Sequence, residues 1–145
     1  MKSLRCMLML ASLIASTLVA QDAQVTPLMS KDLAGFPGKE GLMITVVYPP
    51  GASDPIHRHN AHAFVYVLEG SVVMQVKGGK EITLTPGQSF YEGPNDIHTV
   101  GRNASTTKPA KFIVVLLEDK GAPVLLPVNS TASVSASPKF NSGEK

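Results

Sequence analysis

Short runs of β-branched and aromatic residues, separated by glycine and proline, dominate the chain from Leu42 onward. Six such runs have strand length: 43–48, 63–68, 71–77, 81–85, 89–92 and 111–118. They recur at intervals of about ten residues, which is typical of antiparallel β-structure. No amphipathic helix of ordinary length follows residue 20, so helical bundles and α/β folds fit poorly. We predict an all-β fold closed into a barrel or jelly roll, because closure removes exposed strand edges.

The first twenty residues have a different pattern. Lys2 and Arg5 precede an apolar run, 7–14, and small residues follow up to Ala20. This is the pattern of a secretory signal peptide, and the apolar run is shorter than the roughly 20 residues of a transmembrane helix. We expect cleavage after Ala20 and a secreted or periplasmic protein that has no membrane segment after cleavage.

Removal of this leader changes both the cysteine count and the charge. The single cysteine, Cys6, leaves with the leader, so we expect no disulfides and no thiolate ligands in the mature chain. Loss of Lys2 and Arg5 lowers the basic residues from 13 to 11, which equals the 11 acidic residues. A balanced charge without a basic patch makes nucleic acid an unexpected partner.

The rest of the chain divides into three parts by composition. Residues 21–41 contain Pro27 and Pro37 without helical periodicity, and we expect an irregular arm across the barrel. Residues 42–128 form the predicted β-barrel domain, in which 122–128 is apolar and suits a last edge strand. Residues 129–145, rich in Ser, Ala, Asn and Lys, predict a disordered tail.

Three of the four histidines, His57, His59 and His62, lie within six residues of one another. In extended backbone, residues two apart face the same side, so His57 and His59 present two imidazoles to one point while Arg58 faces away. An isolated pair of this kind is more often an exposed polar loop than a metal site. Here a strongly β-prone run follows directly, and His98 follows a later run and turn. We therefore expect the histidines to converge inside the barrel.

The sequence resembles the cupin superfamily at these residues. The first cupin motif is a glycine, five residues, His-x-His, three or four residues, a glutamate, six residues and a second glycine. Gly51, His57, His59 and Gly70 match it, and Ala63 stands where the family has its metal-binding glutamate.

The second cupin motif, Gly-x5-Pro-x-Gly-x2-His-x3-Asn, is matched by spacing. Gly87 and His98 fit, while Gly93 replaces the proline and Asn95 replaces the glycine. Asparagine tolerates the left-handed conformation of a tight turn. Asn103 lies one position beyond the terminal asparagine, so its role is not carried over. The resemblance spans residues 43–118 and implies a double-stranded β-helix.

By resemblance, His57, His59 and His98 are the metal ligands of this chain. Three neutral imidazoles without a carboxylate favour Fe, Cu, Zn, Ni or Co and make manganese less expected. Two alternatives stay open. His62 could swing inward to replace the missing glutamate, or the site has decayed and the barrel binds an organic ligand without metal, in space opened by Ala63.

Four further residues near the expected mouth could orient a substrate or transfer a proton: Tyr48, Tyr66, Tyr91 and Glu92. Tyrosine in a short strand more often packs, and a lone glutamate at a strand end is more often solvated. We therefore assign no catalytic residue and no organic cofactor from the sequence.

Two functions fit these observations equally. One is an enzyme acting on a small molecule, a metal-dependent dioxygenase or less expectedly an isomerase, since a three-histidine face leaves coordination positions open. The other is a non-catalytic module that binds or senses a small ligand, because fold alone assigns no chemistry. The resemblance also implies a homodimer that pairs through an edge strand.

Overall fold

The computed structural model describes residues 21–128, which form ten β-strands and no helix. The expected signal peptide, 1–20, and the expected tail, 129–145, lie outside the described residues. The strands are β1 Gln24–Asp32, β2 Lys39–Tyr48, β3 His57–Arg58, β4 Ala61–Glu69, β5 Val72–Val76, β6 Ile82–Leu84, β7 Ser89–Glu92, β8 His98–Asn103, β9 Ala110–Asp119 and β10 Leu126–Pro127. Within the described range, no helix is long and apolar enough to cross a membrane.

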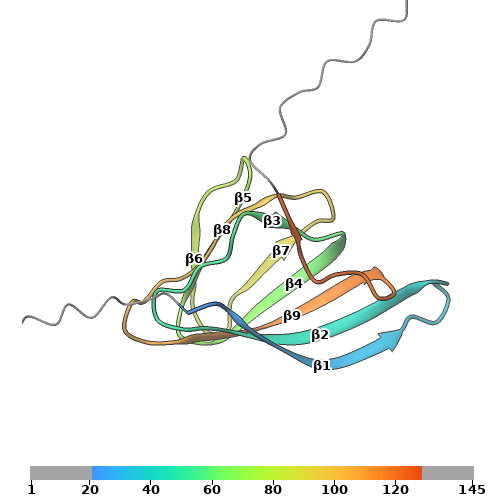
Figure 1. The fold of residues 1–145 in the computed structure, drawn as a ribbon, viewed down its shortest axis with the longest axis horizontal. Helices are drawn as coiled ribbons and strands as arrows, with labels where there is room; N and C mark the ends of the chain where they lie inside the picture. The colour runs from blue at the N-terminus through green and yellow to red at the C-terminus, as the bar shows by residue number, and fades with distance from the viewer. Residues whose placement is uncertain (1–20, 129–145) are drawn as a thin grey trace, which may run out of the picture.

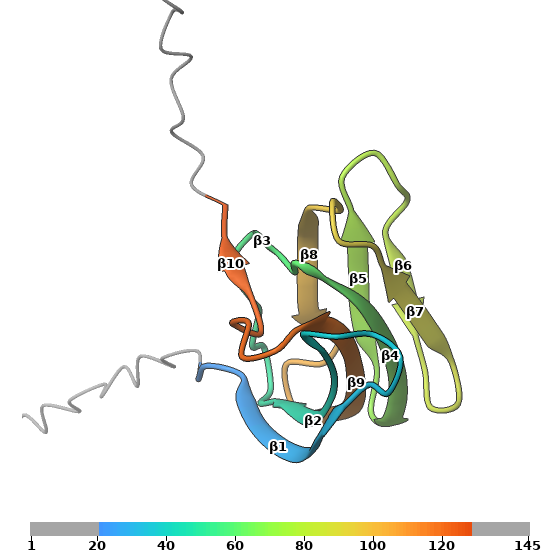
Figure 2. The same ribbon diagram turned by 90° about the vertical axis from the view of Figure 1, so that its right-hand side faces the viewer.

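The strands form two antiparallel five-stranded sheets, which confirms the predicted all-β barrel. The first sheet has the order β1-β2-β9-β4-β7 and the second has the order β10-β3-β8-β5-β6. Figure 1 shows the two sheets facing each other, and Figure 2 shows β10 beside β3 at one end of the second sheet. This pairing confirms the last edge strand expected within 122–128.

The core lies between the sheets because the strands alternate inward and outward residues. In β4 the inward residues Ala61, Ala63, Val65 and Val67 are buried, whereas the intervening residues 62, 64 and 66 are exposed. The largest fully buried side chains come from both sheets: Ile44, Tyr48, Val67, Val72, Met74 and Leu116. One face of each sheet therefore supplies the core, as the period of two requires.

The segment expected to be an irregular arm is instead largely a strand. β1 pairs antiparallel with β2, and a bulge between Pro27 and Met29 interrupts the register. Pro27 is compatible with this placement because β1 is an edge strand and a bulge interrupts the pairing directly after Pro27. The sequence prediction was wrong here because all nine residues of β1 are exposed and so lack the alternating apolar pattern.

Gly70 connects β4 to β5 in a turn that packs against the chain entering β9. Its φ is +69°, and a Cβ at this position would lie 2.5 Å from the Pro109 carbonyl oxygen and 2.8 Å from the Ala110 Cα. Gly78, in the hairpin between β5 and β6, has a similar φ of +84° but nothing within 4 Å of the same point. A substitution at Gly78 would therefore cause conformational strain alone, whereas one at Gly70 would cause strain and a steric collision.

We expect Gly70→Ala to destabilise the fold by about 2 to 4 kcal/mol, because left-handed strain and a backbone collision add. Gly78→Ala should cost only the strain, about 1 to 2 kcal/mol. Denaturant unfolding of both variants and the wild type measures the difference. Equal losses for the two variants would contradict the close approach at Gly70.

Candidate metal centre

The cross-strand register of the second sheet brings two distant histidines together. His57 of β3 pairs directly with His98 of β8, although 41 positions separate them. Their ring centroids are 4.8 Å apart, as are those of His57 and His59. Arg58 is exposed, so the expected division of this segment into two inward imidazoles and one outward residue is confirmed.

A fourth side chain, Glu92, joins the three histidines. It ends β7 and is only 3% exposed. In the first sheet, Glu92 lies directly opposite Ala63 of β4. The carboxylate in the cluster therefore comes from β7, whereas the cupin motif places its glutamate on the neighbouring strand, β4. The expectation that Glu92 is solvated was wrong. The ligands predicted from the sequence were the three histidines alone, and this carboxylate was not among them.

One signal in the sequence could have indicated Glu92. The run 63–68 and the run 89–92 were both predicted strands, and Ala63 stands on the first in place of the motif glutamate. An acidic residue at the end of a neighbouring strand could supply the carboxylate instead. What the sequence did not provide was the pairing of these two strands, which is a long-range contact.

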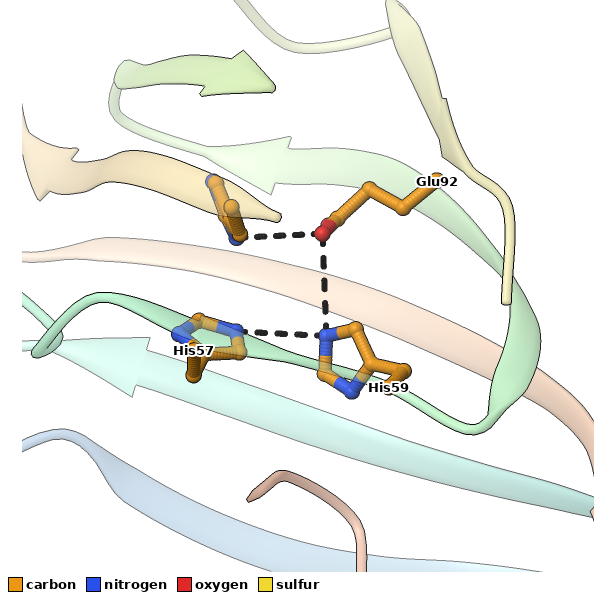
Figure 3. A group of neighbouring side chains, drawn as sticks. His57, His59 and Glu92 are labelled. Carbon is orange, nitrogen blue, oxygen red and sulfur yellow. Dashed lines mark hydrogen bonds and ion pairs between the residues drawn. The ribbon is translucent and has the colours of Figure 1, made fainter. Parts of the chain in front are cut away.

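The four side chains place their ligand atoms close enough to share one ion. One atom from each of His57, His59, Glu92 and His98 lies within 4.8 Å of the other three. The two Nε2 atoms of His57 and His59 are 3.2 Å apart. Oε2 of Glu92 lies 3.7 Å from Nε2 of His59 and 3.2 Å from Nδ1 of His98. Figure 3 shows the rings of His57 and His59 and the carboxylate of Glu92 directed at one another.

Backbone carbonyls fix which nitrogens of His57 and His59 carry protons. The Nδ1–H of His57 donates to the Pro55 carbonyl at 2.8 Å, and the Nδ1–H of His59 donates to the Val124 carbonyl. A carbonyl only accepts, so in the neutral rings both Nε2 atoms hold lone pairs. Two lone pairs that face each other across 3.2 Å repel unless a cation lies between them. Anchoring of this kind is usual for metal-binding histidines.

Burial leaves other polar atoms of the cluster without partners. Oε2 of Glu92 and both ring nitrogens of His98 are buried and form no hydrogen bond among the described residues, although Oε2 lies 3.2 Å from Nδ1 of His98. Burial, together with Asp96 and Asp54, raises the pKa of Glu92 to about 7. Burial and the nearby His57 lower the pKa of His98 to about 4, and burial also lowers that of His59. A divalent cation would offset each of these costs, so the residues fit a metal ion.

His62 does not join the cluster. It occupies an outward position of β4, and its Nδ1 lies 2.7 Å from the hydroxyl of Tyr91, which is also exposed. Strand alternation places it on the opposite face from Ala61 and Ala63, so the proposed inward swing would have to break β4. The alternative in which His62 replaces the missing glutamate is therefore wrong.

The turn between Glu92 and His98 is closed by a side chain. The Gly93 N–H donates to Oδ2 of Asp96 at 2.7 Å, and the Asp96 N–H donates to the Gly93 carbonyl at 3.1 Å. No described residue other than glycine has a positive φ, so Asn95 does not use the left-handed conformation that asparagine tolerates. Asp96 stabilises the turn instead, and the turn sets the separation of Glu92 and His98.

A cavity of about 240 Å³ opens beside the cluster, and its lining contains all four residues. The inward faces of both sheets supply an apolar wall that includes Ile44 and Phe112 of the first sheet and Met74 of the second. Of the tyrosines considered from the sequence, Tyr48 lines this cavity, whereas Tyr66 and Tyr91 are exposed on the outside of the first sheet. The arrangement gives a buried ion site with room for a small molecule next to it.

The sequence matches the family model of the cupin domain over residues 44–116, about half of the chain. No curated protein matches the chain. A solved structure of a protein from Thermus thermophilus is 26% identical with a TM-score of 0.54, and the alignment covers 67% of this chain and 84% of that one.

Two further solved structures share the fold. A cupin domain from Bordetella pertussis Tohama I is 20% identical, with a TM-score of 0.54 and coverage of 70% of this chain and 99% of that one. The DMSP lyase DddQ from Ruegeria pomeroyi DSS-3 is 21% identical, with a TM-score of 0.54 over 60% of this chain. The present chain spans only 42% of that lyase. The two-sheet barrel, the paired motifs and the family match agree, and the chain belongs to the cupin superfamily.

Proposed function

We propose that this protein holds one divalent metal ion in the cluster of His57, His59, Glu92 and His98 and acts on a small molecule in the adjoining cavity. The observation that carries the proposal is the pair of facing Nε2 atoms of His57 and His59, 3.2 Å apart, beside the buried Oε2 of Glu92, which forms no hydrogen bond with the described residues. Buried groups of this kind are usually paired or bind an ion.

The carboxylate changes the range of metals that we propose. Manganese was less expected on the premise that imidazoles alone bind the ion, and Glu92 removes that premise. Oxygen ligands suit manganese as well as iron, and imidazole suits Fe, Cu, Zn, Ni and Co. We therefore propose that the site binds one first-row divalent metal ion, and manganese is again one of the candidate metals.

Two observations favour an enzyme over a binding module. Four protein ligands leave room in an octahedral sphere, and the cavity adjoins them, so a bound ion would act as a Lewis acid on a small ligand. The cavity lining also contains Asp54, an acidic group in addition to Glu92.

A metal-dependent dioxygenase remains the reaction class that we propose first. Its test is oxygen uptake by the metal-loaded protein with candidate substrates. A non-catalytic ligand-binding module is the second candidate, favoured by the apolar wall.

Metal content of the purified mature chain tests the ion site. We expect about one equivalent of a first-row divalent metal by elemental mass spectrometry, either as purified or after loading, and loss of binding in His57→Ala and His98→Ala. His62→Ala is the matched control, because His62 is exposed and outside the cluster. A wild-type protein that binds no added iron, manganese, copper or zinc would refute the proposal.

An exchange of residues tests the role of Glu92. We expect Glu92→Ala to weaken metal affinity at least tenfold, because one charged ligand is lost. The double variant with Glu92→Ala and Ala63→Glu should regain most of that affinity, since position 63 faces position 92 across the strands and points inward. Affinities come from competition with a chromophoric chelator. Wild-type affinity in Glu92→Ala would show that the histidines alone bind the ion.

Export is proposed from residues 1–20, which have the pattern of a signal peptide. Expression of the full chain in a bacterial host should yield a periplasmic protein whose N-terminus is Gln21, because Ala20 ends the small-residue region. Intact-mass measurement and N-terminal sequencing identify the cleavage point. Recovery of the protein in the cytoplasm with Met1 retained would contradict the proposal.

We also propose a homodimer that forms through β1. This edge strand of nine residues is exposed along its length, including Val25, Leu28 and Met29, and a free edge is a template for a second strand. Light scattering should give twice the mass of one chain. The double variant Leu28→Lys and Met29→Lys should be monomeric, because charge on an edge opposes pairing. A monomeric wild type would refute this.

A further inference from the structure

The cavity contains a second polar feature, the pair formed by Tyr48 and Asp54. Tyr48 ends β2, is 1% exposed, and packs its ring edge-on against Phe112 with centroids 5.0 Å apart. Its hydroxyl donates a hydrogen bond to Oδ2 of Asp54. The Asp54 N–H donates to the Gly101 carbonyl of β8 at 2.8 Å, which fixes the loop. Both partners are therefore held in place from two sides.

This pair lies close to the candidate metal centre. A Cβ built on Gly101 would be 3.1 Å from the hydroxyl oxygen of Tyr48 and 3.3 Å from Nε2 of His98. The tyrosine hydroxyl and the His98 ring thus approach the same point of β8. Tyr48, Asp54 and the four residues of the cluster all line the same cavity, so one small molecule can contact both features.

One oxygen of Asp54 is available to a ligand. Oδ2 accepts from Tyr48, whereas no described residue forms a hydrogen bond with Oδ1, and the side chain is only half-buried. Burial and the neighbouring Asp54 raise the pKa of Tyr48, so its hydroxyl stays protonated and remains a donor to the carboxylate. The pair therefore presents an acceptor to the cavity, oriented by the tyrosine.

The charge of the lining restricts which ligands fit. The described residues around the cavity include three carboxylates, Asp22, Asp54 and Glu92, and neither lysine nor arginine. In the metal-free protein, a ligand carboxylate would meet like charge without a cationic side chain to bind it. The apolar wall favours a ligand with a hydrophobic body, and a volume of about 240 Å³ limits its size to one ring or a short chain.

We propose that Asp54, oriented by Tyr48, is a specificity-determining residue that accepts a hydrogen bond from a hydroxyl of the ligand. The selected class is small, uncharged and largely apolar hydroxyl compounds, of which single-ring phenols are the simplest, and carboxylates are disfavoured. This inference rests on the proposed function in one respect, which is that a second oxygen of the ligand would bind the metal ion. The hydrogen bond to Asp54 does not need the ion.

Calorimetric titration of the mature protein with two probes tests this assignment. Catechol offers hydroxyl donors, and benzoate offers a carboxylate on the same ring. In both the metal-free protein and the zinc-loaded protein, we expect Asp54→Asn to weaken catechol about tenfold or more, because a hydrogen bond to a charged acceptor is lost. The same substitution should strengthen benzoate, because it removes a negative charge and supplies an amide donor.

Three controls accompany the titration. Asp119→Asn makes the same chemical change at an exposed residue that pairs with Lys39, and it should leave both affinities unchanged. Tyr48→Phe should weaken catechol less than Asp54→Asn does, because the acceptor remains but loses its orientation. Thermal unfolding verifies that each variant is folded.

The outcomes distinguish this inference from the proposed function. Failure of the wild type to bind metal counts against the proposed function, while an Asp54-dependent preference in the metal-free protein still supports the inference. The inference would be overturned if catechol bound neither the metal-free nor the zinc-loaded protein. It would also be overturned if Asp54→Asn changed the affinities for catechol and benzoate in the same direction, or changed neither.

Discussion

The register between paired strands is the constraint on which the site depends. His57 meets His98 only because β3 pairs with β8 in one register, and Glu92 faces Ala63 only because β7 pairs with β4 in one register. A shift by one residue would turn each of these side chains to the opposite face of its sheet. The buried alternation of β4 and β9 stabilises the correct register, since a slip would expose the core. Packing of the barrel therefore also fixes the geometry of the cluster.

Small side chains in β4 make the cluster compatible with a packed core. Ala61 and Ala63 are fully buried on the inner face, and position 63 lies directly opposite Glu92. The carboxylate expected on β4 is thus supplied by the neighbouring strand at the opposing position. The cluster of this cupin therefore contains a carboxylate from β7, although position 63 on β4 is an alanine.

The chain outside the two motifs also contributes to the cluster. The Val124 carbonyl, between β9 and β10, orients His59, and β10 pairs with β3 beside His57. Residues at both ends of the described range line the cavity, among them Ala23 and Leu125. The terminal segments therefore complete the site that the barrel begins, and they do so without a recognisable motif.

The sequence by itself determined the all-β fold, most of the inner strands and the three histidines. These depend on local signals: alternation, turn residues and the spacing of His57, His59 and His98 within two motifs. Only the tertiary structure decided that Glu92 is the fourth member, that β1 is a strand and that Asp54 shares the cavity with the cluster. Each of these depends on which strands become neighbours, and the free energy that selects neighbours comes from burial across the whole barrel.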